Sequence, residues 1–106
     1  MLHGLVTRGS TPTHFFELPF STQELSDACI TYAAETMEPI DFYLSDCRVK
    51  DKYIIIDLTQ ENTLSFPEGE VVEVQIKVLT KSNKVFVSPT YRLGIEKVLN
   101  GRVMQK

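Results

Sequence analysis

Side chains that commonly carry out chemistry are scarce in this sequence of 106 residues, which holds two histidines, two cysteines and no tryptophan. The residues that could bind a metal ion are His3, His14, Cys29 and Cys47. No two of them stand at the close spacing of a CxxC or HxxxH pair. The spacing therefore indicates neither a metal site nor a bound cofactor.

The sequence also gives little support to catalysis. A nucleophilic mechanism needs a Ser, Cys or Thr beside a base that a third group orients. His14 stands next to two phenylalanines in a run typical of a strand, which indicates a residue at the rim of a sheet. Carboxylates such as Asp41, Asp57 and Glu73 fall at alternating positions that face water, and a deep cleft is needed to raise a catalytic pKa. We expect no enzymatic activity.

Composition indicates one folded domain spanning residues 1–106, with 42% apolar and 24% charged residues. The same composition argues against a membrane span. The formal charge of −3 is too mild for a nucleic-acid-binding protein. The first residues lack a basic lead followed by a long apolar run, so we expect no secretory signal and synthesis in the cytoplasm.

Charge is divided unevenly along the chain. Residues 1–46 carry seven acidic side chains against one basic, a net charge of −6, whereas residues 47–106 carry ten basic against seven acidic, a net of +3. Two surfaces of opposite charge would favour head-to-tail association of copies. The alternative is an accidental distribution over a solvated surface.

Short alternating runs predict strands. Val72–Val78 alternates apolar and polar residues without a break, and we expect it to form a hairpin with 85–88, which Pro89 ends. Residues 53–58 predict a central strand with Ile54, Ile56 and Leu58 inward, paired with 40–44. Residues 59–64 predict one helical turn, capped by Thr59, that crosses between two sheets.

The ends of the chain predict edge strands and arms. Residues 13–20 read as an edge strand with Phe16, Leu18 and Phe20 inward, and residues 91–95 as the last strand. Beyond these strands, residues 1–8 and 100–106 are expected to be flexible or to reach a neighbouring subunit.

Residues 22–34 leave two interpretations open. Ser21 to Glu24 matches a capping box, and helical spacing of apolar residues follows it, which predicts a helix. Alternatively the box starts a single turn, and Ala28, Ile30 and Tyr32 share one face of a strand; we favour this second reading. Whether Cys29 and Cys47 pair is also open, although cysteines of a cytosolic chain are usually free. Together the elements predict an all-β fold, an antiparallel immunoglobulin-like sandwich of six to seven strands.

Apolar side chains that the predicted registers leave outside the core are the candidate contact residues. They are the four aromatics Phe15, Tyr43, Tyr53 and Phe86, and Leu2, Leu5 and Val6 of the N-terminal segment. Apolar area on a sheet face commonly marks contact with another protein or with sugar rings. The alternative is that a loop or the N-terminal segment covers the four aromatics.

Four segments resemble a known family: residues 8–18 (RGSTPTHFFEL), 56–63 (IDLTQENT), 69–78 and 88–93. They are similar to the N-terminal domain of phage baseplate upper proteins and to related small virion proteins of phages that infect Gram-positive bacteria. The likeness covers nearly the whole chain.

The resemblance implies a non-enzymatic virion structural protein, a β-sandwich adaptor that contacts capsid, fibre or baseplate subunits and forms a homo-oligomer. Because the sequence has no coiled coil or receptor-binding extension, the resemblance favours a capsid decoration, a head-fibre base or a connector over a fibre carrier. Two alternatives are a small phage-encoded inhibitor of a host defence system and a carbohydrate-binding module that uses the outward aromatics.

Overall fold

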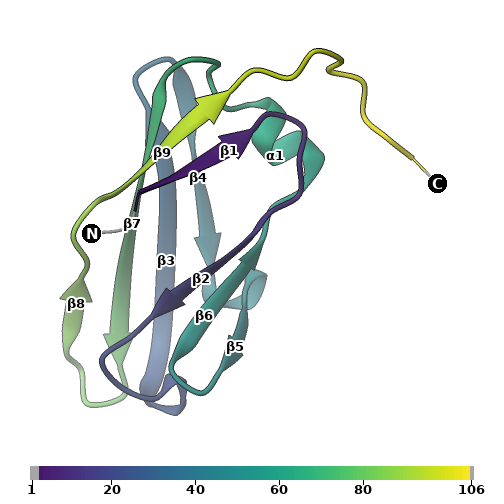
Figure 1. Cartoon of the computed structure of the whole chain (residues 1–106). Helices are drawn as coiled ribbons and strands as arrows, with labels where there is room; N and C mark the ends of the chain where they lie inside the picture. Colours follow the sequence, from purple (N-terminus) through teal and green to yellow (C-terminus); the bar gives the residue numbers. More distant parts are fainter. Residues whose placement is uncertain (1–2, 106) are drawn as a thin grey trace.

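The computed structural model describes residues 3–105, which form two β-sheets packed face to face (Figure 1). The large sheet has the strand order β1-β9-β7-β3-β4, and β8 also pairs with β7. Its strands are β1 (His3–Thr7), β3 (Leu25–Ala34), β4 (Met37–Tyr43), β7 (Val71–Thr80), β8 (Val85–Val87) and β9 (Tyr91–Glu96). The small sheet has the order β2-β6-β5, with β2 (Thr13–Glu17), β6 (Tyr53–Asp57) and β5 (Arg48–Lys50). The predicted all-β sandwich is confirmed.

Two long strands, β3 and β7, form the centre of the large sheet. Every second residue of β7 from Val72 to Val78 is buried, as the alternation predicted, and these side chains face the small sheet. In β3 the buried side chains are Ala28, Ile30 and Tyr32, and a 3-10 turn at Thr22–Glu24 precedes the strand. The structure therefore confirms the second reading of residues 22–34.

The small sheet places β6 at its centre and β2 at its edge, as predicted. Ile54 and Ile56 are fully buried, and Phe16 of β2 packs beside them in the core. The same core includes Leu58 and Leu18 just beyond the strand ends, so both strands contribute alternate residues to the interior.

A short helix, α1 (Gln60–Leu64), carries the chain from β6 in the small sheet to β7 in the large one. Thr59 caps it, because the threonine hydroxyl accepts a hydrogen bond from the backbone N–H of Asn62. Both the helical turn and its cap agree with the prediction. Within residues 3–105 no helix is long and apolar enough to cross a membrane.

The prediction was wrong about the partner of β6. Residues 40–44 do not pair with β6; β4 lies beside β3 in the large sheet, and the three-residue strand β5 pairs with β6. A turn at residues 51–52 joins β5 to β6, and Asp51 adopts a positive φ of 54° in it. A 3-10 turn at Leu44–Asp46 carries the chain from one sheet to the other before β5 begins.

The expectation of a free N-terminal arm was also wrong for the described part of residues 1–8. Residues 3–7 form β1, which pairs with β9 in parallel, the one departure from antiparallel pairing among the described strands. Val6 is only 2% exposed and belongs to the core. Nine strands are present among residues 3–105, more than the six to seven predicted. The additional strands are β5, which has only three residues, and β1, which lacks clear alternation.

The C-terminal residues after β9 extend away from the sheets (Figure 1). The side chain of Gln60 holds this segment near α1, donating to the carbonyl of Met104 at 2.8 Å and accepting from its N–H at 2.7 Å. The described part of the predicted 100–106 arm thus carries no strand or helix but touches the domain through α1.

Candidate interaction surfaces

The outer side of the small sheet combines aromatic and charged side chains, and we call it the small-sheet face. It comprises Thr13, Phe15 and Glu17 of β2, Tyr53, Ile55 and Asp57 of β6, and Arg48 of β5. Phe15 is 57% exposed, whereas Ile55 beside it is buried although it points away from the core. The Tyr53 hydroxyl donates to Glu17 at 3.1 Å, and Lys52 lies 3.5 Å from the same carboxylate.

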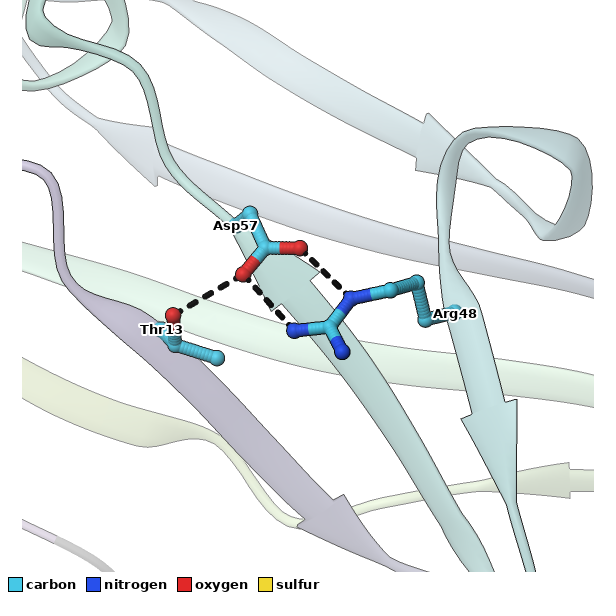
Figure 2. Close-up of polar contacts among 3 residues, drawn as sticks. All are labelled: Thr13, Arg48 and Asp57. Carbon is cyan, nitrogen blue, oxygen red and sulfur yellow. Dashed lines mark hydrogen bonds and ion pairs between the residues drawn. The ribbon is translucent and has the colours of Figure 1, made fainter.

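An ion pair spans this face from β5 to β6 (Figure 2). The Arg48 guanidinium donates two hydrogen bonds to the Asp57 carboxylate, from Nε at 2.8 Å and from Nη2 at 2.9 Å. Thr13 on β2 donates a third, at 2.9 Å. One carboxylate therefore connects all three strands of the small sheet.

Hydrogen bonding fixes the charges of this pair. The bonds from Arg48 and then Thr13 lower the pKa of Asp57, and the bond to Asp57 raises the pKa of Arg48. Both groups stay charged near neutral pH and have their hydrogen bonds satisfied. The pair suits a structural role better than proton transfer.

The sandwich is open on the side where β2 of the small sheet faces β1, β9 and β8 of the large sheet. A mostly apolar hollow of about 420 Å³ lies there. Its lining includes Leu5, Phe15, Phe16, Tyr91 and Leu93. A second hollow of about 240 Å³ follows between β2 and β8, lined by Phe86 and sharing Tyr91 with the first. We call the two hollows together the open-side groove. Its volume and apolar lining are typical of binding sites.

His14 is one of the polar residues that line this groove. Its Nδ1 lies 2.6 Å from the hydroxyl of Tyr32, and the two rings stack 5.8 Å apart. Burial raises the pKa of Tyr32 and lowers that of His14, so the tyrosine donates and the imidazole is neutral. We assign the ring proton of His14 to Nε2. The pair links β2 of the small sheet to β3 of the large sheet and is therefore an inter-sheet contact.

The predicted contact residues are spread over three surfaces. Phe15 and Tyr53 lie on the small-sheet face, and Tyr43, 52% exposed, lies on the outer side of the large sheet. Phe86 is 45% exposed at the open-side groove, where its ring packs 5.3 Å from Phe20. The four aromatics therefore do not make one flat platform of the kind that stacks on a sugar.

The three candidates from the N-terminal segment have different outcomes. Leu5 is 72% exposed at the open-side groove and remains a contact candidate. Val6 is buried between the sheets and cannot touch a partner, so that prediction was wrong. Neighbouring residues of a strand point to opposite faces, which explains why the two differ. Leu2 lies outside the described residues.

Sequence reasoning missed two parts of the exposed surface. Val85 and Val87 are exposed on both sides of Phe86, although strand-forming apolar residues suggested a half-buried strand. Three apolar residues in a row were the available signal, since a strand can bury only one of its faces against a single core. The groove itself was missed because the spacing between two sheets is not encoded in any local pattern.

The two cysteines are both free and half-buried. Cys47 donates to the carbonyl of Tyr43 at 3.3 Å, and burial, followed by Asp46 and Cys29, raises its pKa to about 11. A thiol with this pKa stays protonated at neutral pH, so Cys47 is a poor nucleophile and a poor metal ligand.

No group of three or more His, Cys, Asp or Glu side chains within residues 3–105 is arranged to hold a metal ion. Comparisons of the sequence with known protein-family models and with curated proteins find no match. A proposal for the function therefore rests on the geometry of the small-sheet face and of the open-side groove.

Proposed function

We propose that this chain is a non-enzymatic structural protein of a phage virion and acts through protein–protein contacts. In this proposal it is a capsid decoration, a head-fibre base or a connector to the tail or baseplate. Its partners are other virion proteins and further copies of itself, and it works without a cofactor, nucleic acid or membrane.

The observation that carries the proposal is the apolar surface around the open side of the sandwich. The exposed large apolar side chains that line the open-side groove are Leu5, Phe15, Phe86 and Val87. Several such residues along one groove are typical of a protein-binding surface, because folded monomers seldom leave large contiguous apolar patches in water. In an assembly, a neighbouring subunit would cover this apolar area.

The resemblance to small virion proteins supports the proposal mainly through the fold. Two of the segments that carry it meet in space: the Thr63 hydroxyl donates to the carbonyl of Ser10 at 2.7 Å, and Arg8 donates to the carbonyl of Leu64 at 2.8 Å. These contacts fasten the loop after β1 to α1. The motif residues thus stabilise the fold. The proposed role in a particle depends instead on the residues of the exposed surface.

Purification of particles of the phage that encodes this chain tests the proposal. We expect the chain to remain with assembled particles through a density gradient and to be released only when the particles dissociate. Its absence from particles, together with capture of a host defence protein, would instead support an inhibitor. Saturable binding to a glycan array that Tyr43→Ala abolishes would support the carbohydrate-binding alternative.

A matched pair of variants shows which surface is used. Phe86→Ser removes an exposed side chain of the open-side groove, and Tyr43→Ser removes one on the outer side of the large sheet. If the groove is the contact, Phe86→Ser lowers incorporation into particles and Tyr43→Ser leaves it unchanged. Equal incorporation of both variants and the wild type would contradict the assignment of the groove.

A further inference from the structure

The two edges of the large sheet differ in charge. Around the β4 edge, residues 35–46 contain four exposed acidic side chains and no basic one. These are Glu35, Glu38, Asp41 and Asp46. At the opposite edge, the β7–β8 hairpin carries the exposed lysines Lys77, Lys81 and Lys84.

Among the described residues these charges form no salt bridge, although the Asp41 carboxylate accepts from the Thr31 hydroxyl and the Asp46 carboxylate accepts from the Tyr43 N–H. In the described part of the chain the salt bridges join Arg8 with Glu68, Arg48 with Asp57, and Lys52 with Glu17. None of them involves the four carboxylates of the β4 edge or the three lysines of the hairpin. Opposite charges on a second molecule would therefore meet no internal competitor.

Each of the two edges also has backbone groups that pair with no further strand, although at the end of β4 the Tyr43 N–H donates to Asp46 and its carbonyl accepts from Cys47. Among the described strands, β4 pairs only with β3, and β8 pairs only with β7. Figure 1 shows β8 and β4 on opposite sides of the β7–β3 pair. On β8, Val85 and Val87 are 56% and 55% exposed and would be covered by an added strand.

The strand directions fit a contact between copies in the same orientation. From β8 to β7, to β3 and to β4, each pairing is antiparallel, so β4 runs opposite to β8. A second copy placed beside the first without reversal would bring its β8 antiparallel to the β4 of the first. Antiparallel pairing is the more frequent and slightly more stable arrangement.

We propose that the β8 edge of one copy pairs with the β4 edge of a second copy, head to tail, and extends the large sheet from subunit to subunit. This inference rests on the proposed function and names a second copy as the partner at these edges. Lysines of the hairpin then lie against carboxylates of β4. Contact of either edge with itself would bring like charges together, which favours the head-to-tail arrangement over a symmetric dimer.

Pro39 limits where the pairing occurs. A proline has no N–H to donate to a neighbouring strand, so the first part of β4 is blunted. The part after it that is available for pairing, residues 40–42, has the same length as β8, because the backbone groups of Tyr43 are bonded to Asp46 and Cys47. Because the two faces of this contact are different, association continues until a ring closes or a filament grows.

Charge reversal on each edge tests the inference with the intact chain. One variant carries Glu38→Lys and Asp41→Lys on β4, and the other carries Lys81→Glu and Lys84→Glu in the hairpin. The mass in solution is measured by sedimentation at about 10 mM salt, where screening is weak, and at chain concentrations up to about 1 mM. We expect the wild type to associate and each variant alone to lose at least about tenfold in association constant, because the two reversed positions of each variant then face side chains of the same charge on the other edge.

Mixing the two variants gives the decisive readout. The hairpin of the first variant is still basic and faces the acidic β4 of the second, and the reversed edges are complementary as well. We expect an equal mixture to associate as the wild type does. The double reversal Glu61→Lys with Lys97→Glu, on exposed residues outside both edges, is the matched control and should behave as the wild type.

Four results would overturn the inference: a wild type that stays monomeric up to about 1 mM at low salt, variants that associate as strongly as the wild type, a mixture that stays monomeric, or a control that loses association as the edge variants do. Unchanged circular dichroism and melting of each variant show that folding is intact. These outcomes leave the proposed function standing, because presence of the chain in purified particles is measured separately.

Discussion

The end of the sandwich at α1 and the open-side groove bound the same core in different ways. At α1, Phe66 is 1% exposed and stacks on Tyr32, and the buried Thr63 hydroxyl donates to Ser10. At the groove, Leu5 and Phe15 remain largely exposed. One boundary is completed by the chain itself, whereas the other leaves apolar area that only a partner can cover. The difference separates residues that stabilise the fold from residues available for contact.

Truncating an aromatic ring at each boundary should give the largest contrast. We expect Phe66→Ala to lower the free energy of unfolding by about 3–5 kcal/mol, because it leaves a cavity beneath a closed surface. Phe15→Ala should change it by no more than about 0.5 kcal/mol, since the ring is mostly in water. Urea denaturation measures both values. Equal losses would show that the groove side is as closed as the α1 end.

Removing the buried hydroxyl at α1 should have the next largest effect. In Thr63→Val the side chain keeps its shape but leaves the carbonyl of Ser10 without this donor, at a cost of about 1–3 kcal/mol. Thr36→Val is the control, because its hydroxyl donates to Glu70 on the surface. If the two variants unfolded at the same urea concentration, the Thr63 contact would not be what fastens α1.

Acidification should weaken the contact that His14 makes beside the groove. Burial lowers the pKa of His14 in the folded state below its ordinary value of 6.5, so the folded chain binds that proton less readily than the unfolded chain. The contribution of His14 to stability is therefore complete above pH 6.5 and declines as the pH falls through and below that value. Urea denaturation at several pH values from neutral to acidic checks this decline.

A ring without a titrating nitrogen provides the comparison. His14→Phe should have a flatter dependence of stability on pH than the wild type, and effects of other titrating groups cancel in the difference. A dependence as steep as that of the wild type would mean that His14 is not the group responsible.

The smallest effect is expected at the small-sheet face. Arg48→Ala breaks the ion pair with Asp57, but both groups are exposed, so water and salt compensate for most of the loss. We expect Arg48→Ala to lower the free energy of unfolding by less than Phe66→Ala or Thr63→Val does, and we expect no change in high salt. A loss comparable to that of Thr63→Val would indicate that the ion pair is shielded from water.

The sequence was sufficient to predict strands whose residues alternate and a turn whose cap is local. Val72–Val78 and the turn capped by Thr59 were predicted because each depends on neighbours in the chain. The partner of β6 was not, because β5 has three residues and leaves no periodic signal. The parallel pairing of β1 with β9 joins segments almost 90 residues apart and likewise has no local pattern.

Contact residues were predicted only in part for the same reason. Alternation placed Phe15 outside the core correctly, but whether an outward side chain is covered depends on elements distant in sequence. Val6 was taken for part of an arm because nothing in residues 1–8 shows that β9 lies beside them. The groove and the two charged edges exist only once the sheets are assembled.

Electron cryomicroscopy of the phage particle in which we propose that this chain resides tests the central claim most directly. We predict density for this sandwich in the particle, with Leu5, Phe86 and the rest of the open-side groove covered by a neighbouring subunit. A particle map without the chain, or with the groove facing solvent at every copy, would contradict the account.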